Sequence, residues 1–217
     1  TVEDPVEYQL DGVNQVQVFE DIGLTFGSTL RSILRQDPDV LLIGEIRDGE
    51  TADIAVKFAL TGHLVFSTVH ANDAPGTITR LLDIGIAPFL VGSCLNLVMA
   101  QRLVRRLCNN CKEEYTPTKQ ELGLVGLDPS KVPGKLYKAK GCAECRNTGY
   151  KGRLAIFEMI PMARDLRKLV FENANEDEIR QASLNNGMET LREAGLARVL
   201  DGTTSIEEVL RSTVEEL

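Results

Sequence analysis

The sequence is poor in aromatic residues: it has no tryptophan, and phenylalanine and tyrosine together make up 5% of its 217 residues. A net charge of -8 at pH 7 excludes a broad electrostatic attraction to nucleic acid or to anionic lipid. Because few aromatic side chains are available to stack on bases, the composition gives no footprint of a nucleic-acid-binding protein. We therefore expect no nucleic-acid partner.

Long apolar segments are also missing. No apolar run approaches the roughly 18–20 residues that span a bilayer. The N-terminus lacks the basic region and the apolar region of a signal peptide. These absences favour an ordinary globular protein of the cytoplasm, and the opening TVEDPVEY, which resembles the end of an element, suggests a fragment.

The order of the segments that are present is typical of an α/β fold. The apolar run VLLI, residues 40–43, predicts a strand that is covered on both faces. Helical spacing follows in residues 50–62, and residues 63–70 predict another strand. This order favours a parallel, doubly wound sheet. Residues 15–19 suggest a further short strand, and residues 25–36 suggest a helix capped by Thr25 or a neighbouring residue.

The rest of the chain is mainly helical in pattern. Residues 76–85 and 88–107 each predict a helix, and further helices are expected from about residue 162 onward. Gly187 and Gly202 separate the later helices. Thr204 or Ser205, together with Glu208, resembles a capping box.

An acidic segment, GEIRD, follows the apolar strand at residues 44–48. Acids at the carboxyl edge of a parallel sheet match the Walker B arrangement, in which a carboxylate holds Mg²⁺ or orients the attacking water. A buried strand with a solvated acidic end is also common without such a role. Two groups of side chains nearby favour the functional interpretation: the acids Glu3, Asp4 and Glu7, which alone would fit a polar turn, and the polar end of residues 63–73.

That second group could hydrogen-bond phosphate or water, and it includes Thr68 and His70. His63 and His70 are the only histidines of the chain. Arg31 and Arg35 share one helical face, which suits either phosphate oxygens or a solvated surface.

Four of the five cysteines form two C-x2-C pairs. Such pairs can place four thiolates tetrahedrally around Zn²⁺, and with all four positions filled the site would be structural. Reduced free thiols and an iron–sulfur centre are the alternatives. The expected ligands are Cys108, Cys111, Cys142 and Cys145. Cys94 stands alone and is expected to be a buried small hydrophobe.

The chain resembles the secretion ATPases that power type II secretion and type IV pilus assembly, the GspE and PilB group. The segments that resemble this family are TVEDPVEY, LRSILRQDPDVLLIGEIRDGETADIAVKFALTGHLVFSTVHAND, QRLVRRLC, CAECRNTGYKGR and LREAGLARVLDGTTSIEEVLR. The resemblance implies an α/β, RecA-like parallel sheet with an inserted tetracysteine zinc knob and a helical C-terminal part. The corresponding boundaries are 1–107, 108–153 and 154–217.

The resemblance also implies roles for individual residues. Glu45 would be the main catalytic carboxylate, and Glu3 and Glu7 would act near Mg²⁺ and the lytic water. His63 and His70 would belong to the family's His box, with His70 sensing the γ-phosphate. Arg31 and Arg35 would reach phosphate. Further contacts to the cofactors Mg²⁺ and ATP are expected from Asp4, Asp48 and Thr68.

One departure from the family pattern is large, because no G-x-x-x-x-G-K-[ST] motif occurs in the chain. In the family this loop lies upstream of TVEDPVEY and supplies most of the grip on phosphate. We therefore interpret the chain as the C-terminal part of a hexameric motor ATPase that is inactive by itself. It would lie in the cytoplasm at the inner membrane, with a platform protein of the secretion or pilus machine as its partner.

A rival interpretation treats the isolated chain as a non-catalytic, zinc-stabilised docking module for that platform protein. The missing loop favours this rival, whereas the acidic segments and the His box favour the motor. The sequence motifs do not separate protein secretion from pilus assembly.

Overall fold

The computed structural model describes residues 1–132 and 134–213 and divides into two compact units. Unit 1 comprises Thr1–Val98 and Ile160–Gly187, and unit 2 comprises Met99–Met159 and the chain from Met188 onward. The chain passes from one unit to the other within strands β5 (Leu97–Leu107) and β8 (Tyr150–Pro161), which pair with each other. The three consecutive domains expected from the sequence remain a prediction.

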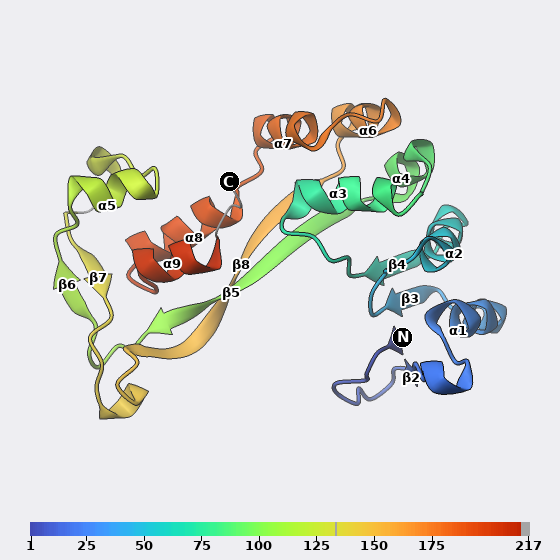
Figure 1. The fold of residues 1–217 in the computed structure, drawn as a ribbon, viewed down its shortest axis with the longest axis horizontal. Helices are drawn as coiled ribbons and strands as arrows, with labels where there is room; N and C mark the ends of the chain where they lie inside the picture. Colours follow the sequence, from blue (N-terminus) through green and yellow to red (C-terminus); the bar gives the residue numbers. More distant parts are fainter. Residues whose placement is uncertain (133, 214–217) are drawn as a thin grey trace. The chain divides into compact units, whose positions relative to one another are not determined.

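Unit 1 contains a parallel four-stranded sheet of order β2-β1-β3-β4 (Figure 1). Its strands are β1 (Val2–Glu3), β2 (Val16–Gln17), β3 (Val40–Ile43) and β4 (Leu64–Ser67). The longest pairing runs from Val40 opposite Leu64 to Ile43 opposite Ser67. Since all four strands point the same way, their carboxyl ends meet at one edge, which confirms the parallel α/β fold expected from the sequence.

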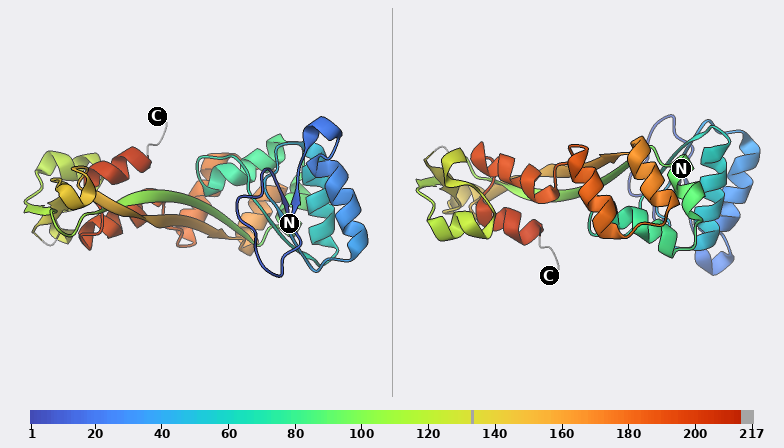
Figure 2. Two further views of the ribbon diagram at one scale, coloured as in Figure 1. Left: turned by 90° about the horizontal axis from the view of Figure 1, so that it is seen from below. Right: turned by 90° about the horizontal axis from the view of Figure 1, so that it is seen from above.

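Helices α1 (Phe26–Ile33) and α2 (Gly49–Leu60) lie side by side against this sheet (Figures 1 and 2). Thr25 caps α1 as expected, in a capping box with Ser28, and a 3-10 turn (Leu34–Gln36) follows the helix. Leu30 on α1 is fully buried, as are Leu41 and Ile43 on β3. These side chains form the apolar layer between the helices and the sheet.

The other helices of unit 1 are α3 (Ala74–Asp83), α4 (Pro88–Cys94), α6 (Arg164–Phe171) and α7 (Glu176–Asn185). Helix α3 packs on α7, and α4 packs on α6. The second contact needs Gly92, because a Cβ there would lie 2.5 Å from the ring of Phe171. Segments more than 70 residues apart in sequence therefore form one helical layer.

The prediction of a single helix over residues 88–107 is wrong. Helix α4 ends at Cys94, and β5 begins at Leu97. Over most of β5 the side chains alternate: Val98, Ala100 and Val104 are buried, whereas Met99 is half exposed. This period of two is a strand pattern, and β-branched valines fit a pleated surface better than a helix.

Strand β8 was not predicted either, although it has the same alternation. Ile156 and Ile160 are buried, whereas Phe157 and Met159 are partly exposed. The paired strands β5 and β8 run side by side in both views of Figure 2. The C-terminal part therefore begins with a strand, and its helices begin only at α6, close to the expected residue 162.

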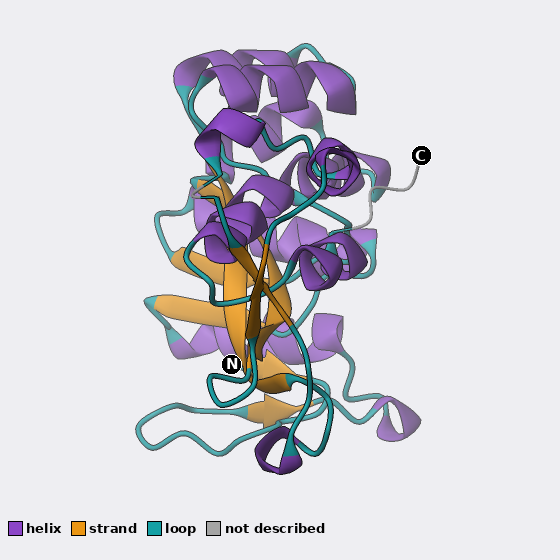
Figure 3. Ribbon diagram, turned by 90° about the vertical axis from the view of Figure 1, so that its left-hand side faces the viewer, coloured by secondary structure: helices purple, strands orange, loops and turns teal. Residues whose placement is uncertain are grey.

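In the described residues, unit 2 combines a small antiparallel hairpin with α-helices; Figure 3 distinguishes helices from strands by colour. The hairpin consists of β6 (Glu113–Tyr115) and β7 (Leu136–Lys138), and the helices are α5 (Lys119–Leu124), α8 (Leu191–Leu200) and α9 (Ile206–Ser212). Its core is an apolar cluster from α5, β7, α8 and α9: Leu122, Val125, Leu136, Leu196, Val199, Ile206 and Val209.

The capping box expected at the start of α9 is half present. Ser205 accepts a hydrogen bond from the backbone of Glu208, as the motif requires. The Glu208 side chain does not return to the cap. It is buried and accepts hydrogen bonds from Arg105 on β5 and from Arg211 on α9.

None of the helices in the part of the chain that the structure describes combines the length and the apolarity that crossing a bilayer requires.

Candidate functional site

Four ionisable side chains gather at the carboxyl edge of the parallel sheet: Asp4, Glu45, Arg47 and His70. We call them the edge cluster. The Glu45 carboxylate accepts two hydrogen bonds from Arg47, with Nε–Oε2 and Nη2–Oε1 distances of 2.5 Å each. His70 Nε2 lies 3.1 Å from the same Oε2. Arg47 Nη1 is 4.0 Å from a carboxylate oxygen of Asp4.

Glu45 is the most shielded member of the edge cluster, since its side chain is 13% exposed. The hydrogen bond from Arg47 is the main cause that lowers the pKa of Glu45, and it outweighs the opposing effect of burial. Glu45 in turn raises the pKa of Arg47. The carboxylate is therefore ionised at neutral pH, and its remaining lone pairs are hydrogen-bond acceptors suited to a water or a hard cation.

Local backbone geometry brings β1 close to the end of β3. The Gly44 N–H donates to the carbonyl of Val2 at 2.7 Å. A Cβ on Gly44 would lie 3.1 Å from that same carbonyl oxygen. Glycine at this position therefore allows the backbone of β1 to approach the end of β3 closely, which brings Asp4 near the other members of the edge cluster.

The end of β4 is attached to β3 by two hydrogen bonds. The Thr68 hydroxyl donates to the carbonyl of Gly44 at 2.6 Å, and the Ile46 N–H donates to the carbonyl of Thr68 at 2.9 Å. This attachment holds the segment after β4 next to Glu45. Thr68, expected from the sequence to contact the cofactor, thus has a structural partner.

Other residues of the expected site lie outside the edge cluster. Glu3 accepts hydrogen bonds from the Thr1 hydroxyl and from Gln15 Nε2, the latter at 3.0 Å. Glu7 is exposed. The His63 ring stacks on Phe58 with a centroid distance of 3.9 Å, at the end of α2. Their roles in catalysis remain predictions.

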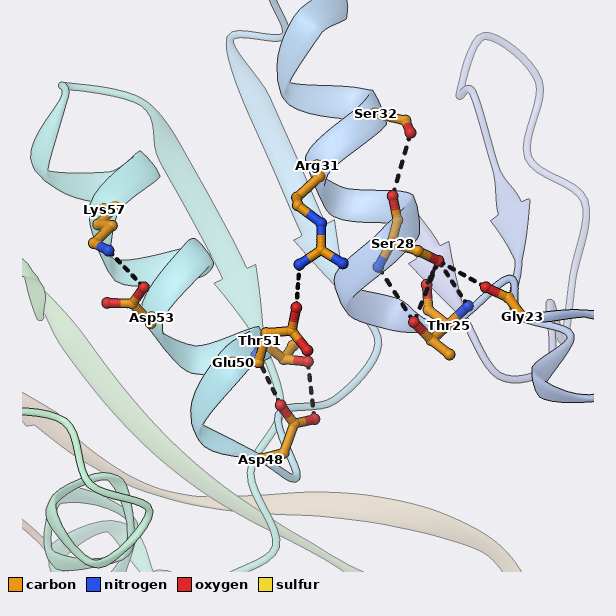
Figure 4. Close-up of polar contacts among 10 residues, drawn as sticks. All are labelled: Gly23, Thr25, Ser28, Arg31, Ser32, Asp48, Glu50, Thr51, Asp53 and Lys57. Atoms are coloured by element: carbon orange, nitrogen blue, oxygen red, sulfur yellow. Dashed lines mark hydrogen bonds and ion pairs between the residues drawn. The ribbon is translucent and has the colours of Figure 1, made fainter.

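Arg31 and Asp48 belong to the helices α1 and α2 that cover the sheet (Figure 4). Arg31 on α1 forms an ion pair with Glu50 on α2. Asp48 is the N-cap of α2: its Oδ1 accepts from the Thr51 N–H at 2.8 Å. Arg35 lies exposed in the 3-10 turn after α1. The structure therefore gives Arg31 and Asp48 local partners and does not bring them to Glu45.

Arg47 is the member of the edge cluster that the sequence did not single out, although GEIRD contains it. A signal was present: in the extended chain after a strand, side chains two positions apart point to the same side, so residues 45 and 47 can pair.

The four cysteines expected to bind metal come together in unit 2. Their Sγ atoms all lie within 4.8 Å of one another. Three of the separations are Cys142–Cys145 at 3.7 Å, Cys111–Cys145 at 3.8 Å and Cys108–Cys142 at 3.9 Å. Tetrahedral zinc with Zn–S bonds of about 2.3 Å requires separations of roughly 3.8 Å, so the cluster could hold this ion.

Backbone groups around the cluster also fit a metal site. The N–H groups of Cys142 and Gly149 each lie 3.2 Å from the Cys145 sulfur. Burial raises the pKa of Cys145, but these hydrogen bonds lower it to about 6, whereas burial raises the pKa of Cys111 to about 12. At neutral pH Cys145 is therefore a thiolate, whereas Cys111 keeps its proton. A bound cation would favour the thiolate of Cys111 as well and so complete the set of sulfur ligands.

A parallel sheet with an acidic cluster at its carboxyl edge and a separate four-cysteine cluster defines an α/β protein with a ligand-binding edge. Residues 1–211 match the model of the family described as "Type II/IV secretion system protein". The chain belongs to this family.

Individual relatives agree with this assignment. The chain is 51% identical to the type IV pilus assembly ATPase PilB of Myxococcus xanthus and covers 38% of that protein's length. It is 50% identical to the type II secretion system protein E of Pseudomonas aeruginosa and covers 43% of its length. Both alignments include 100% of this chain. The chain thus spans about two fifths of the curated relatives that it matches.

The fold also matches a solved structure, a crystal structure of the pilus retraction motor PilT with bound ADP. The TM-score is 0.68 at 26% sequence identity, and the match covers 99% of this chain and 52% of the other. The comparison supports the α/β fold of a motor ATPase.

Proposed function

We propose that the longer protein containing this chain is a motor ATPase that couples ATP hydrolysis to type II secretion or type IV pilus assembly. The observation that supports this most directly is the edge cluster, in which Glu45, Arg47 and His70 meet at the carboxyl edge of the parallel sheet. Family membership supplies the reaction class, and the cluster supplies the chemical groups.

Each residue of the edge cluster has a role in this proposal. Glu45 orients the attacking water, since its carboxylate is ionised and held by two neighbours. His70 contacts the γ-phosphate, and Asp4 lies where an oxygen ligand could serve the Mg²⁺ that accompanies ATP. The bound magnesium would supply neutralisation of phosphate charge. Glu3, Glu7, His63, Arg31, Arg35, Asp48 and Thr68 retain the roles that the family resemblance implies.

The four-cysteine cluster binds a structural zinc ion in this proposal. The ligand spacing fits zinc, and no position is left open for a substrate. The protein works as a homo-hexamer in the cytoplasm and engages a platform protein of the inner membrane. The alternative of a non-catalytic docking module rests on the missing phosphate-binding loop alone.

The test compares this chain with a version extended upstream through the phosphate-binding loop. We expect only the longer version to bind Mg·ATP by calorimetry, whereas both hold one zinc per chain. In the longer version, Glu45→Gln should abolish most ATP turnover, and the matched change Glu172→Gln, of an exposed carboxylate on α6, should not. Normal turnover by the Glu45→Gln protein would contradict the assignment.

A further inference from the structure

The segment between β4 and α3, residues 68–73, carries His70 to the edge cluster. We call it the His70 loop. The His70 side chain is 85% exposed, so little packing fixes it. Besides its contact with Glu45, the position of the ring depends on how the loop backbone is held, and the two ends of the loop have clear partners.

The first end is attached to β3 by the two hydrogen bonds of Thr68. The second end is Asp73, the N-cap of α3, whose Oδ1 accepts from the Gly76 N–H at 2.8 Å. The other oxygen, Oδ2, accepts from Arg180 Nη2, also at 2.8 Å. Arg180 belongs to α7, 107 residues later in the chain.

Arg180 itself is held by a second acid on its own helix. The same Nη2 donates to Glu176 Oε1 at 2.6 Å, one turn earlier on α7. Glu176 Oε2 lies 3.4 Å from the Thr79 hydroxyl on α3. A Cβ on Gly76 would approach that oxygen to 3.4 Å, so α3 and α7 are in close contact here.

Partial shielding distinguishes this ion pair from exposed pairs of unit 1 such as Lys168–Glu172. The Arg180 side chain is 31% exposed and that of Asp73 is 22% exposed, whereas Lys168 and Glu172, paired on α6, are 74% and 58% exposed. Shielded pairs with good hydrogen-bond geometry restrain their partners more than exposed ones do.

We propose that Arg180 is a positioning residue for His70. By holding Asp73, it fixes the second end of the His70 loop and with it the approach of the imidazole to Glu45. The loop is then anchored to the sheet at one end and to α7 at the other, so α7 sets the geometry of the edge cluster without contacting it. The consequence for ATP turnover rests on the proposed function, but the positioning itself does not.

The positioning can be measured on this chain by NMR of its imidazole groups, since it has only two histidines. His63, stacked on Phe58 in the same unit, serves as the internal reference. In Arg180→Gln we expect the His70 ring signals to move toward those of an unrestrained histidine and the His63 signals to stay in place. In Arg180→Lys, which keeps one charged donor, the His70 signals should lie closer to their wild-type positions than in Arg180→Gln.

Two further variants separate the ion pair from general effects. Asp73→Asn keeps an N-cap, because asparagine caps helices as well as aspartate does, but loses the charge that Arg180 binds. It should reproduce the Arg180→Gln shift of His70. Lys168→Gln removes an exposed ion pair from α6 and should change neither histidine. If Arg180→Gln perturbs both histidines, its effect is not specific to His70, and Asp73→Asn becomes the deciding variant. Unchanged His70 signals in Asp73→Asn would overturn the proposal.

The catalytic consequence is tested in the longer protein that includes the phosphate-binding loop. We expect Arg180→Gln to lower kcat by about 10- to 100-fold with little change in the KM for ATP, because a displaced group loses its alignment. A shifted His70 with unchanged kcat would keep the positioning but contradict the role of His70 in turnover. Loss of turnover with unmoved His70 signals would refute the positioning.

Discussion

Replacing Glu208 by glutamine should destabilise unit 2 more than any surface charge would. The Glu208 side chain is fully buried and accepts five hydrogen bonds from two arginines. Arg105 contributes its backbone N–H at 2.9 Å and its Nη2 at 2.6 Å, and Arg211 contributes Nη2 at 2.7 Å. Glutamine has nearly the same volume, but its amide nitrogen would face guanidinium donors and leave them unsatisfied.

Two lines of reasoning give a similar magnitude. Burial alone would raise the pKa of Glu208, but the hydrogen bonds from Arg211 and Arg105 lower it from 4.5 to about 2. Such a shift corresponds to about 3 kcal/mol of stability at neutral pH. Removing one partner of a buried ion pair typically costs about 3–5 kcal/mol. We therefore expect Glu208→Gln to lose about 3 kcal/mol at pH 7.

The direction of the pH dependence follows from the lowered pKa. The folded protein keeps Glu208 charged at pH values where the unfolded chain binds a proton. The stabilisation is therefore complete above the unfolded pKa of 4.5 and is lost as the pH falls toward 2. The wild-type protein should lose this contribution over that range, whereas the Glu208→Gln protein has none to lose.

Urea denaturation followed by tyrosine fluorescence measures the effect, because the chain has no tryptophan and three of its four tyrosines lie in unit 2. Tyr150 reports directly, since Arg105 lies 4.1 Å from its ring centroid. Glu207→Gln, of the exposed neighbour on α9, is the matched control. Metal release at low pH affects all three proteins alike and cancels in the comparison. A loss below about 1 kcal/mol for Glu208→Gln, or an unchanged pH dependence, would refute the reasoning.

Three further outcomes are expected. Chelation of the metal should shift the tyrosine-detected unfolding of unit 2 to lower urea, because metal binding is coupled to folding, whereas Cys94→Ser should leave the metal content unchanged. Arg47→Gln should raise the pKa of Glu45, since Arg47 is the main cause that lowers it, and carbon NMR titration of the carboxylates would detect an unmoved pKa as a failure. Gly195→Ala should destabilise unit 2 by about 1–2 kcal/mol in urea despite its better helix propensity, because the added methyl would lie 2.8 Å from Val209; equal or higher stability would contradict the packing.

The parallel sheet and its covering helices could be predicted because their signals are local. Thr25 caps α1 and the apolar run at residues 40–43 forms β3, as the pattern indicated. The pairing of β5 with β8 could not be predicted, since residues 88–107 have enough apolar side chains for either period. A partner strand about 50 residues away decided the outcome, which is a tertiary effect on local propensity.

The candidate sites divide in the same way. The four cysteines could be predicted to lie together because the spacing of two C-x2-C pairs is itself typical of a metal site. The structure brings their sulfur atoms together. Arg180 could not be found, because a residue on a helix of ordinary composition contacts Asp73 only through the packing of α3 on α7. Glu208 is an intermediate case. Its spacing from Ser205 correctly indicated a helix cap, but its side chain forms ion pairs with Arg105 and Arg211 instead of returning to the cap.

Strand β3 is less buried than its run of four apolar residues predicts. Four consecutive apolar residues predict a strand that is covered on both faces, but in the described residues only one face is covered. Leu41 and Ile43 are buried under the helices, whereas Val40 is 56% exposed and Leu42 is 38% exposed. Phe66, on the neighbouring strand β4, is 52% exposed as well. The apolar pattern of β3 therefore indicates more burial than the described residues give this strand.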